Sequence, residues 1–377
     1  MKIYAVGGAV RDELLGLSVT DRDYVVVGST PEEMVRLGYK PVGKDFPVFL
    51  HPRTNEEYAL ARTERKVARG YKGFQVHSAP DVTLEQDLER RDLTINAMAR
   101  DETGRLVDPF GGAGDLERGL LRHISPAFSE DPVRILRVAR FAARFGFAVA
   151  PQTMALMRSM VASGEADALV PERVWQEFSR GLMEGEAALM FRVLAEARLL
   201  ERLLPELKLA FENGRPVNDS ARTLVRALDC AARERLGLAP RFALVASRSG
   251  SGDSTRALSE RLKAPGDCRD LALLVVLHGE TVRRAPGSRA SEILSLLERC
   301  DALRRPERFR DLLAVCECID SSERGWCEIP YPPRVTLRRA LAAAVGVDAG
   351  TIAAASAKAD IPAKVREARV AAIEALG

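Results

Sequence analysis

The stretch VGGAVRDELLGLSVTDRDYVVV, residues 6–27, places a tight backbone turn, a cation and two carboxylates close together. Gly7 and Gly8 let the backbone approach another group closely, and an arginine lies on the helical turn that follows them. Asp21 and Asp23 stand at the start of a β-branched run that is typical of a strand. These features predict a short α/β segment near the beginning of the chain.

The two aspartates form an Asp-x-Asp pair. Because side chains alternate along a strand, a spacing of two puts both carboxylates on one face. Two neighbouring carboxylates repel each other unless a cation joins them, and Mg²⁺ prefers carboxylate oxygens supplemented by substrate phosphates. The pair therefore predicts a metal platform for nucleotidyl transfer, while the text TDRD taken alone also suits a solvated turn.

The residues just upstream favour the metal platform. Gly7 and Gly8 allow the backbone to approach a triphosphate, and Arg11 is a candidate bidentate phosphate donor. No Lys-Ser/Thr pair follows the glycines, so the stretch is not a Walker A loop.

Composition limits the class of protein. At 377 residues the chain is long enough for two or three domains, and 46% hydrophobic with 29% charged residues is ordinary for a soluble globular protein. The net charge of +3 is too small to indicate a polyanionic partner by itself. No stretch approaches the roughly 20 apolar residues that cross a bilayer, and charged text follows the apolar N-terminus at once. We therefore expect no signal peptide and no membrane partner.

The six cysteines all lie in the C-terminal half, without the density of a disulfide framework. We interpret them as reduced thiols in a cytoplasmic protein. Zinc binding by the last three is an alternative, but no histidine or fourth cysteine sits at finger spacing, so buried thiols are favoured. The cysteines are Cys230, Cys268, Cys300, Cys316, Cys318 and Cys327.

The changing pattern of apolar, glycine and proline residues along the sequence predicts an α+β fold in three regions. Residues 1–125 mix short β-rich runs with Gly and Pro, which indicates a small head domain with a mixed sheet. Residues 126–218 repeat apolar positions every three or four residues and predict an all-helical neck and body. The polar break FENGRPVNDS separates these from a helical C-terminal region, residues 219–377. Within that region we expect SRSGSGDST and RRAPGSRA to be mobile loops.

The segment EDPVRILRVARFAAR, residues 130–144, carries a candidate base-reading pair. Asp131 and Arg134 are three apart at a predicted helix start and so share a face. The carboxylate can accept from an exocyclic amino group while the guanidinium donates to a ring nitrogen. Cytosine and adenine both offer that pattern, whereas uracil and guanine would leave buried groups unpaired. The pair predicts selection of CTP and ATP without a nucleic-acid template. Arg137 and Arg140 continue the face, for which an exposed basic stripe is the alternative interpretation.

Five segments between residues 5 and 177 follow one another in the order of a known family. This order resembles the class II nucleotidyltransferases, which comprise bacterial CCA-adding enzymes and poly(A) polymerases. The text KDFPVFLHPRTNEEYALARTERK, residues 44–66, is more similar to the proteobacterial CCA-adding branch. The segments are GGAVRD with TDRD at 7–23, RRDLTINA at 90–97, DPFGGAGDL at 108–116, EDPVRILRVARFAAR at 130–144 and PERVWQE at 171–177.

The resemblance implies a nucleotidyltransferase head and the addition of C, C and A to the 3′ end of tRNA from CTP and ATP. It implies that Asp21 and Asp23 are the catalytic metal ligands for Mg²⁺, with Glu57 either a third carboxylate or a plain surface residue. The loop with Gly70 and Gly73 would adjust the pocket from C to A. The implied nucleotide-binding residues are Gly8, Arg11, Arg91, Asp92, Asp131, Arg134, Arg137 and Arg140.

The C-terminal region departs from the family pattern. Relatives of this branch carry an HD phosphohydrolase domain there, whose metal site needs several histidines and a His-Asp pair. Residues 219–377 hold one histidine, His278, and read ALVASRSGSGD where the pair is expected. We therefore expect a degenerate HD-like region without metal ligands that supports the tRNA. A poly(A) polymerase and a catalytically inactive RNA-binding relative remain alternatives, and the sequence indicates no oligomeric state.

Overall fold

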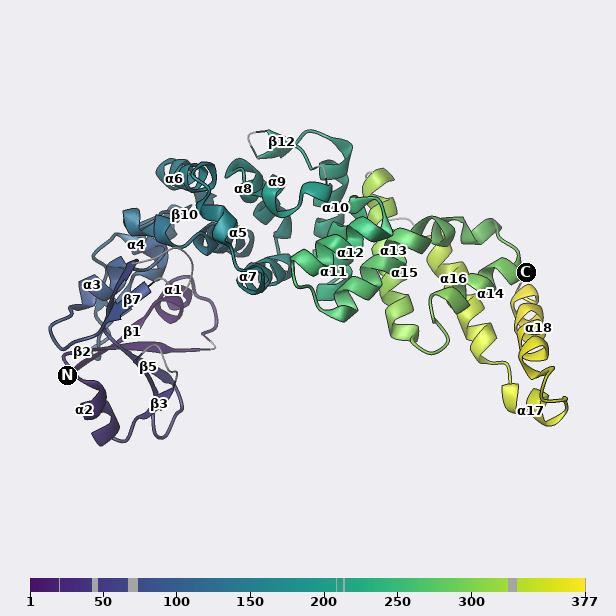
Figure 1. The fold of residues 1–377 in the computed structure, drawn as a ribbon, viewed down its shortest axis with the longest axis horizontal. Coiled ribbons are helices and arrows are strands. Elements are labelled where there is room, and N and C mark those ends of the chain that lie inside the picture. Colours follow the sequence, from purple (N-terminus) through teal and green to yellow (C-terminus); the bar gives the residue numbers. More distant parts are fainter. Residues whose placement is uncertain are drawn as a thin grey trace. The chain divides into compact units, whose positions relative to one another are not determined.

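The computed structural model divides into two compact units. The first comprises Met1–Glu177 with Leu189–Leu199, and the second Phe178–Ala188 with Leu200–Gly377. Figure 1 shows strands gathered in the N-terminal part of the chain and helices through the rest, which confirms the predicted α+β class. The described residues are 1–19, 21–42, 47–66, 74–207, 209–212, 214–324 and 331–376.

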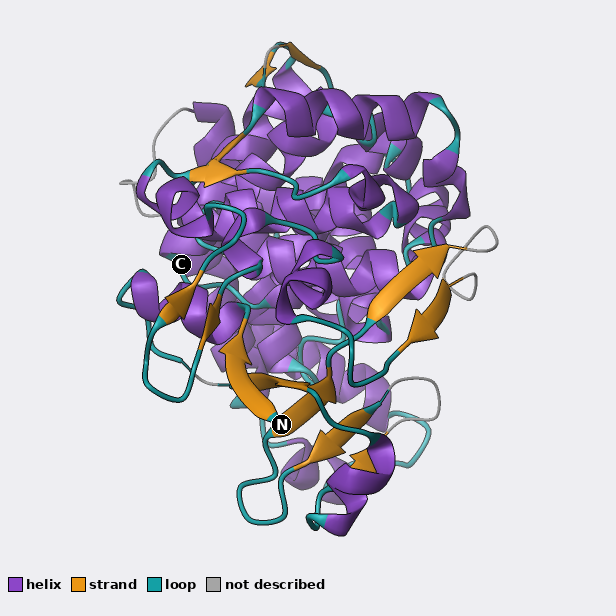
Figure 2. Cartoon of the chain, turned by 90° about the vertical axis from the view of Figure 1, so that its left-hand side faces the viewer, coloured by secondary structure: helices purple, strands orange, loops and turns teal. Residues whose placement is uncertain are grey.

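The first unit is built on a mixed sheet, seen as orange arrows in Figure 2. Within the described residues its strand order is β3-β4-β5-β2-β1-β8-β9. β2 pairs in parallel with β5, whereas β2 with β1 and β5 with β4 are antiparallel. The strands are β1 (Lys2–Val6), β2 (Asp23–Val27), β3 (Lys40–Val42), β4 (Val48–Leu50), β5 (Glu57–Leu60), β8 (Ala99–Arg100) and β9 (Leu106–Val107).

Local signals explain where the helices of this unit begin and end. The Thr30 hydroxyl accepts from the Glu33 amide to cap α2, and Thr83 with Gln86 forms a capping box on α3. Gly146, with a φ of 70°, ends α5 in the left-handed region that favours glycine. The helices are α1 (Gly8–Leu14), α2 (Pro31–Arg36), α3 (Leu84–Glu89), α4 (Gly112–Glu117), α5 (Val133–Phe145) and α6 (Pro151–Ala162), with α7 (Pro171–Met183) and α8 (Ala187–Glu196) crossing the division between the units.

Apolar side chains fix the sheet against its helices. Val6 and Val25 from adjacent strands pack in one buried cluster with Leu88 of α3 and Ala99 of β8. Burying such side chains stabilises the unit by about 1.5–3 kcal/mol each. Two short pairs complete the unit, β6 (Thr63–Lys66) with β7 (Phe74–His77) and β10 (Leu120–Leu121) with β11 (Ala148–Val149).

The described part of the second unit is helical except for the pair β12 (Phe211–Glu212) and β13 (Arg215–Pro216). α13 packs on both α11 and α15, and α10 packs on α15. No described helix is long and apolar enough to cross a membrane. The helices are α9 (Leu200–Leu203), α10 (Asp219–Arg233), α11 (Leu238–Ala246), α12 (Gly252–Arg261), α13 (Gly266–Arg284), α14 (Ala290–Arg299), α15 (Pro306–Arg324), α16 (Pro332–Val345), α17 (Ala349–Ala354) and α18 (Ile361–Glu374).

The prediction of two mobile loops in the second unit is wrong. SRSGSGDST forms a 3₁₀ turn and then the start of α12, because the Ser251 hydroxyl accepts from the Ser254 amide at 3.1 Å and caps the helix. RRAPGSRA forms the end of α13, a 3₁₀ turn over Ala285–Gly287 and the start of α14. The serines and glycines of these stretches lie at the ends of helices and in 3₁₀ turns and do not form a flexible linker.

The cysteines and the predicted boundaries have different outcomes. Five cysteines, all except Cys327, are buried and form no disulfide, which confirms their interpretation as buried thiols. Cys327, Gly70 and Gly73 lie outside the described residues. FENGRPVNDS leads through the β12–β13 pair into α10. The chain changes from one unit to the other for the last time earlier, at Leu199–Leu200.

Candidate active site

Strand register brings the Gly-Gly turn and two carboxylates to one edge of the sheet. Val6 is opposite Asp23 in the β1–β2 pair, and Asp23 is opposite Glu57 in the β2–β5 pair. Gly7 directly follows β1 and begins α1 with a φ of 68°, a conformation that favours glycine. Asp21 lies two residues before the first residue of β2 and is exposed. The predicted placement of Glu57 on a neighbouring strand is confirmed, and its role stays a prediction.

The Asp23 carboxyl is electrostatically perturbed. Partial burial raises its pKa above the usual range, the Arg91 guanidinium acts in the opposite direction, and the Asp21 carboxylate adds to the rise. A raised pKa means that the surroundings disfavour the charged carboxylate. A cation placed between the two aspartates would reverse this balance.

Arg91 lies against the glycine turn. A Cβ built at Gly7 would be 2.7 Å from Arg91 Nη1, so a side chain there would displace the guanidinium. Arg91 Nη2 lies 3.3 Å from Asp87 Oδ2, and Nη1 donates to the Asn96 carbonyl at 3.4 Å. The Asp87 side chain is fully buried and also accepts from Arg90. The structure thus holds one predicted nucleotide-binding cation beside the turn and Asp23.

Arg11 has a different position from the one the sequence led us to expect. Its guanidinium is buried and donates to Asp12 Oδ1 at 2.8 Å and Asn96 Oδ1 at 2.5 Å. It also lies over the rings of Phe141 and Phe145, at 5.2 and 4.9 Å from their centroids. These partners offset the cost of burial and leave the guanidinium linking α1 to α5, not displayed toward a phosphate.

Asp92 and Arg137 form the centre of a buried ion-pair network. Arg137 Nε donates to Asp92 Oδ2 at 2.8 Å, and Asn96 Nδ2 donates to Asp92 Oδ1 at 2.9 Å. Burial alone would raise the pKa of Asp92, but the Arg137 guanidinium and the Asn96 amide hold it well below its usual range. Asn96 therefore joins Arg11 to Asp92, and both predicted residues share one network.

Glu177 extends that network from α7. Its Oε2 accepts from Arg140 Nε at 2.6 Å, and its Oε1 from Arg137 Nη1 at 3.3 Å. Glu177 is only 5% exposed, so its charge depends on these two arginines. Our sequence reasoning did not single it out. The sequence did hold one signal for it: Glu177 is the last residue of the segment PERVWQE, within α7. It is an acidic residue on the buried face of that helix.

The predicted base-reading pair is only partly where the sequence placed it. Asp131 lies outside α5, because Pro132 follows it and pushes it into extended backbone with φ −126° and ψ 104°. Its carboxylate accepts from both terminal nitrogens of Arg173, at 3.1 and 2.7 Å. Arg134 donates to the carbonyls of Arg90, at 2.6 Å, and Ala127, at 3.1 Å. The expectation of a shared helical face is corrected, although the two charges still interact electrostatically.

The remaining motifs support the site through backbone contacts. Gly8 is the first residue of α1, and a Cβ there would lie 3.6 Å from Arg11 Nη2. Asp108 accepts from the amides of Gly112, at 2.7 Å, and Ala113, at 2.9 Å, and so caps α4. A Cβ at Gly112 would collide with the Thr94 carbonyl oxygen, so this motif packs tightly on RRDLTINA.

Comparison with known proteins identifies the family. Residues 3–122 match the model of the poly A polymerase head domain, and residues 146–211 match that of a probable RNA and SrmB-binding site of polymerase A. The chain is 54% identical to the multifunctional CCA protein of Laribacter hongkongensis over 399 residues, covering 100% of this chain and 98% of the relative. The chain belongs to the family of multifunctional CCA proteins. Another of these proteins, from Nitrosomonas europaea, is 52% identical over 404 residues and 99% of this chain, with 98% of the relative covered.

Solved structures of two CCA-adding enzymes share the fold of this member of the multifunctional CCA protein family. The Bacillus stearothermophilus CCA-adding enzyme in complex with CTP has a TM-score of 0.69 and 25% identity, covering 97% of this chain and 87% of that one. The Thermotoga maritima CCA-adding enzyme complexed with tRNA has a TM-score of 0.65 and 20% identity, covering 100% and 92%. At this identity the second likeness concerns the fold alone.

Proposed function

We propose that the protein adds C, C and A to the 3′ end of tRNA from CTP and ATP and releases pyrophosphate, without a nucleic-acid template. The observation that carries this proposal is the sheet edge where the Gly7 turn, Asp23 and Glu57 share one row with Arg91 beside them. The family membership and the full-length similarity to multifunctional CCA proteins support it.

The donor set at the sheet edge fits Mg²⁺. Asp21 and Asp23 offer exposed carboxylate oxygens, which are the ligands this ion prefers, and Glu57 stands next to them in register. The raised pKa of Asp23 indicates a carboxylate that would be stabilised by a cation. When bound, Mg²⁺ would supply charge neutralisation of the triphosphate and a lower pKa for the attacking 3′-hydroxyl.

The chain's own residues position the nucleotide. The backbone at Gly8 provides a start of α1 that a phosphate can approach closely, and Arg91 adds a positive charge beside it. Asp92, Arg137 and Arg140 form the network that holds α5 against this region. Arg11 contributes by fixing α1 to α5, since its guanidinium is already paired inside the unit.

Base selection falls to Asp131 and Arg134. Both have protein partners that a nucleobase edge can replace: Arg173 for the carboxylate and backbone carbonyls for the guanidinium. An exchange of one set of hydrogen bonds for another costs little, whereas uracil or guanine would displace these partners and leave both groups unpaired. The proposed discrimination therefore arises from unpaired polar groups and not from shape.

We also propose the division into a catalytic head over residues 1–125, a neck and body over 126–218 and a tRNA-supporting region over 219–377, in a cytoplasmic protein. The helices of the last region carry many arginines on their exposed faces, which suits an RNA backbone.

One incubation tests the activity. The full chain is supplied with tRNA that lacks its terminal CCA, with Mg²⁺ and with labelled CTP, ATP or both. We expect CTP alone to extend the tRNA by two residues and both nucleotides together by three. Repeated addition of A without C would indicate a poly(A) polymerase instead, and no incorporation with a tRNA that still binds would indicate an inactive relative.

A further inference from the structure

The buried carboxylate of Asp87 joins the two consecutive arginines of the motif RRDLTINA, and our sequence reasoning did not single it out. Asp87 lies on α3, and its side chain is fully buried. Its Oδ1 accepts from Arg90 Nη2 at 2.7 Å, and its Oδ2 accepts from Arg91 Nη2 at 3.3 Å. Spacings of three and four residues let both guanidinium groups return to one turn of the helix. One acidic side chain therefore fixes the direction of both arginines.

The Asp87 carboxylate remains charged in this position. Burial raises its pKa, but the guanidinium groups of Arg90 and Arg91 outweigh burial and hold the pKa below its usual range. The backbone amide of Arg62 also donates to Oδ1, at 3.3 Å. An ionised carboxylate is a stronger hydrogen-bond acceptor than a neutral group. Asp87 thus ties the end of α3 to the chain just before β6.

Arg90 uses its side chain entirely within the protein. Its Nε and Nη2 donate to Asp87 Oδ1, at 3.1 and 2.7 Å, and its Nη1 donates to Glu64 Oε1 at 2.9 Å. Its backbone carbonyl accepts from Arg134 Nη2 at 2.6 Å. A base that replaces the longer contact of Arg134, to the Ala127 carbonyl at 3.1 Å, leaves this one in place. The position of Arg90 therefore determines where the candidate base-reading guanidinium points.

Arg91 keeps an unused donor beside the glycine turn. Its Nη1 donates to the Asn96 carbonyl at 3.4 Å, and its buried Nε has no hydrogen-bond partner among the described residues. A Cβ at Gly7 would lie 2.7 Å from Nη1, so the guanidinium lies directly against the turn that begins α1. A buried donor without a partner is costly unless a ligand satisfies it. An oxygen of a triphosphate is an acceptor of the kind that this donor lacks.

We propose that Asp87 is a positioning residue of the nucleotide site. It orients Arg91 toward the triphosphate, and through the Arg90 carbonyl it directs Arg134 toward the base. This inference rests on the proposed selection of CTP and ATP by Asp131 and Arg134. Asp87 itself contacts no nucleotide, because its carboxylate is buried and both of its oxygens already accept from arginines. Its substitution should therefore change the relative affinity for different nucleotides and not only the stability of the fold.

Calorimetric titration of the full chain with CTP, and separately with UTP, tests the proposal in the presence of Mg²⁺ and without tRNA. Asp87→Asn should lower the ratio of CTP affinity to UTP affinity by about tenfold, because a displaced Arg134 no longer penalises an unpaired uracil edge. The new amide also presents donors to Arg91, so CTP itself should bind about threefold to tenfold more weakly. A purely structural role would lower the fraction of folded protein and leave the affinity ratio unchanged.

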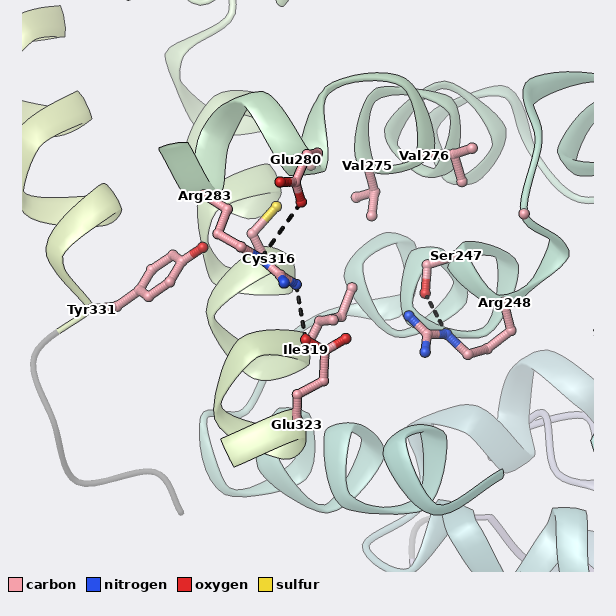
Figure 3. Close-up of a pocket in the computed structure, with 12 residues that line it drawn as sticks. Ser247, Arg248, Val275, Val276, Glu280, Arg283, Cys316, Ile319, Glu323 and Tyr331 are labelled. Atoms are coloured by element: carbon pink, nitrogen blue, oxygen red, sulfur yellow. Dashed lines mark hydrogen bonds and ion pairs between the residues drawn. The ribbon is translucent and has the colours of Figure 1, made fainter. Parts of the chain in front are cut away.

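Asp115→Asn is the matched control within the same unit. Asp115 is also buried and pairs with two arginines, Arg118 at 2.8 Å and Arg122 at 3.1 Å, neither of which is a candidate nucleotide-binding residue. This variant should lose stability and keep the affinity ratio of the wild type. Glu323→Gln is a remote control, since Glu323 pairs with Arg283 at 3.0 Å in the second unit (Figure 3), and it should change neither affinity.

Equal affinity ratios in the wild type and Asp87→Asn overturn the proposal, as does an equal fall of the ratio in Asp87→Asn and Asp115→Asn. A wild type that binds CTP and UTP equally overturns it too. Should Asp87→Asn fail to fold, Glu64→Gln takes its place, because the Glu64 side chain is 19% exposed and pairs with Arg90. Glu64→Gln should lower the ratio by about twofold to fivefold, and an unchanged ratio then overturns the proposal. A wild type that prefers CTP in this titration but adds nothing to tRNA overturns the proposed function, while the ratio in the variants still decides this inference.

Discussion

Arg137 on α5 donates from Nε to Asp92 Oδ2 at 2.8 Å, joining the neck helix to the motif RRDLTINA of the head. The Asp92 side chain is 6% exposed and that of Arg137 is 33% exposed. Solvent therefore reaches the arginine of this pair but hardly reaches the carboxylate. Asn96 and Glu177 supply further partners to its two members. Motifs that lie 45 positions apart in the sequence are thus one electrostatic unit.

Asp92→Asn should destabilise the first unit by about 2–4 kcal/mol, because it leaves the Arg137 charge without its main partner in a largely buried network. Native-state hydrogen exchange of amides in α5 measures this free energy of opening. Asp219→Asn is the control, measured by exchange of the amides of its own helix α10: Asp219 pairs with Arg222 but its side chain is 95% exposed, so the loss there should stay below about 1 kcal/mol. Equal effects of the two variants would contradict the importance of the buried network.

The same network should make stability depend on acid pH. Asp92 and Asp87 both have pKa values below the usual range, Asp92 through Arg137 and Asp87 through Arg90, which outweigh the opposing effect of burial. A depressed pKa in the folded state contributes stability above the unfolded pKa of about 3.9, and this contribution is lost as the pH falls below it. We expect α5 amides to lose protection below about pH 4. Asp92→Asn should flatten this dependence, and an unchanged slope would exclude Asp92 as its source.

Gly7→Ala should disturb the site through Arg91 as well as through backbone strain. The φ of 68° disfavours any Cβ by about 1–2 kcal/mol, and the new methyl would also meet Arg91 Nη1. Gly16→Ala separates the two effects, since Gly16 has the same φ but no heavy atom within 4 Å. Both variants should lose thermal stability, whereas only Gly7→Ala should raise the KM for CTP. A KM raised equally by both would remove Arg91 from the explanation.

Short-range patterns in this sequence predicted more than long-range pairs did. The β-branched run after Asp23, the glycine turn and the periodic helix ending at Gly146 all depend on neighbouring residues. The local sequence was therefore sufficient to predict these elements. The burial of Arg11 depends on Asn96, which is 85 positions away, and no local rule connects the two. Asp131 was misplaced because Pro132 was treated as a helix residue without its effect on the residue before it.

The metal ligands give the sharpest test of activity. Asp21→Asn or Asp23→Asn should reduce incorporation of CTP and ATP by about two orders of magnitude or more, since each loses a charged oxygen ligand. Binding of tRNA, measured by filter retention, should change little. Glu57→Gln distinguishes a third ligand from a surface residue, because only a ligand would share the loss. Near-normal incorporation by either aspartate variant would place the metal elsewhere.

Asp131→Ala and Arg134→Ala should relax the choice of base. In the wild type, uracil and guanine leave the carboxylate and the guanidinium unpaired, a penalty of about 1–3 kcal/mol for each group, and truncation removes the group that is penalised. The incorporation of each of the four nucleotides is measured as kcat/KM. The values for UTP and GTP should rise relative to those for CTP and ATP.

Arg173→Ala is the control variant, because it removes the ion pair of Asp131 at 2.7 Å while leaving the carboxylate in place. Selectivity for CTP and ATP should survive in Arg173→Ala, and unchanged selectivity in both Asp131→Ala and Arg134→Ala would assign base reading to other residues.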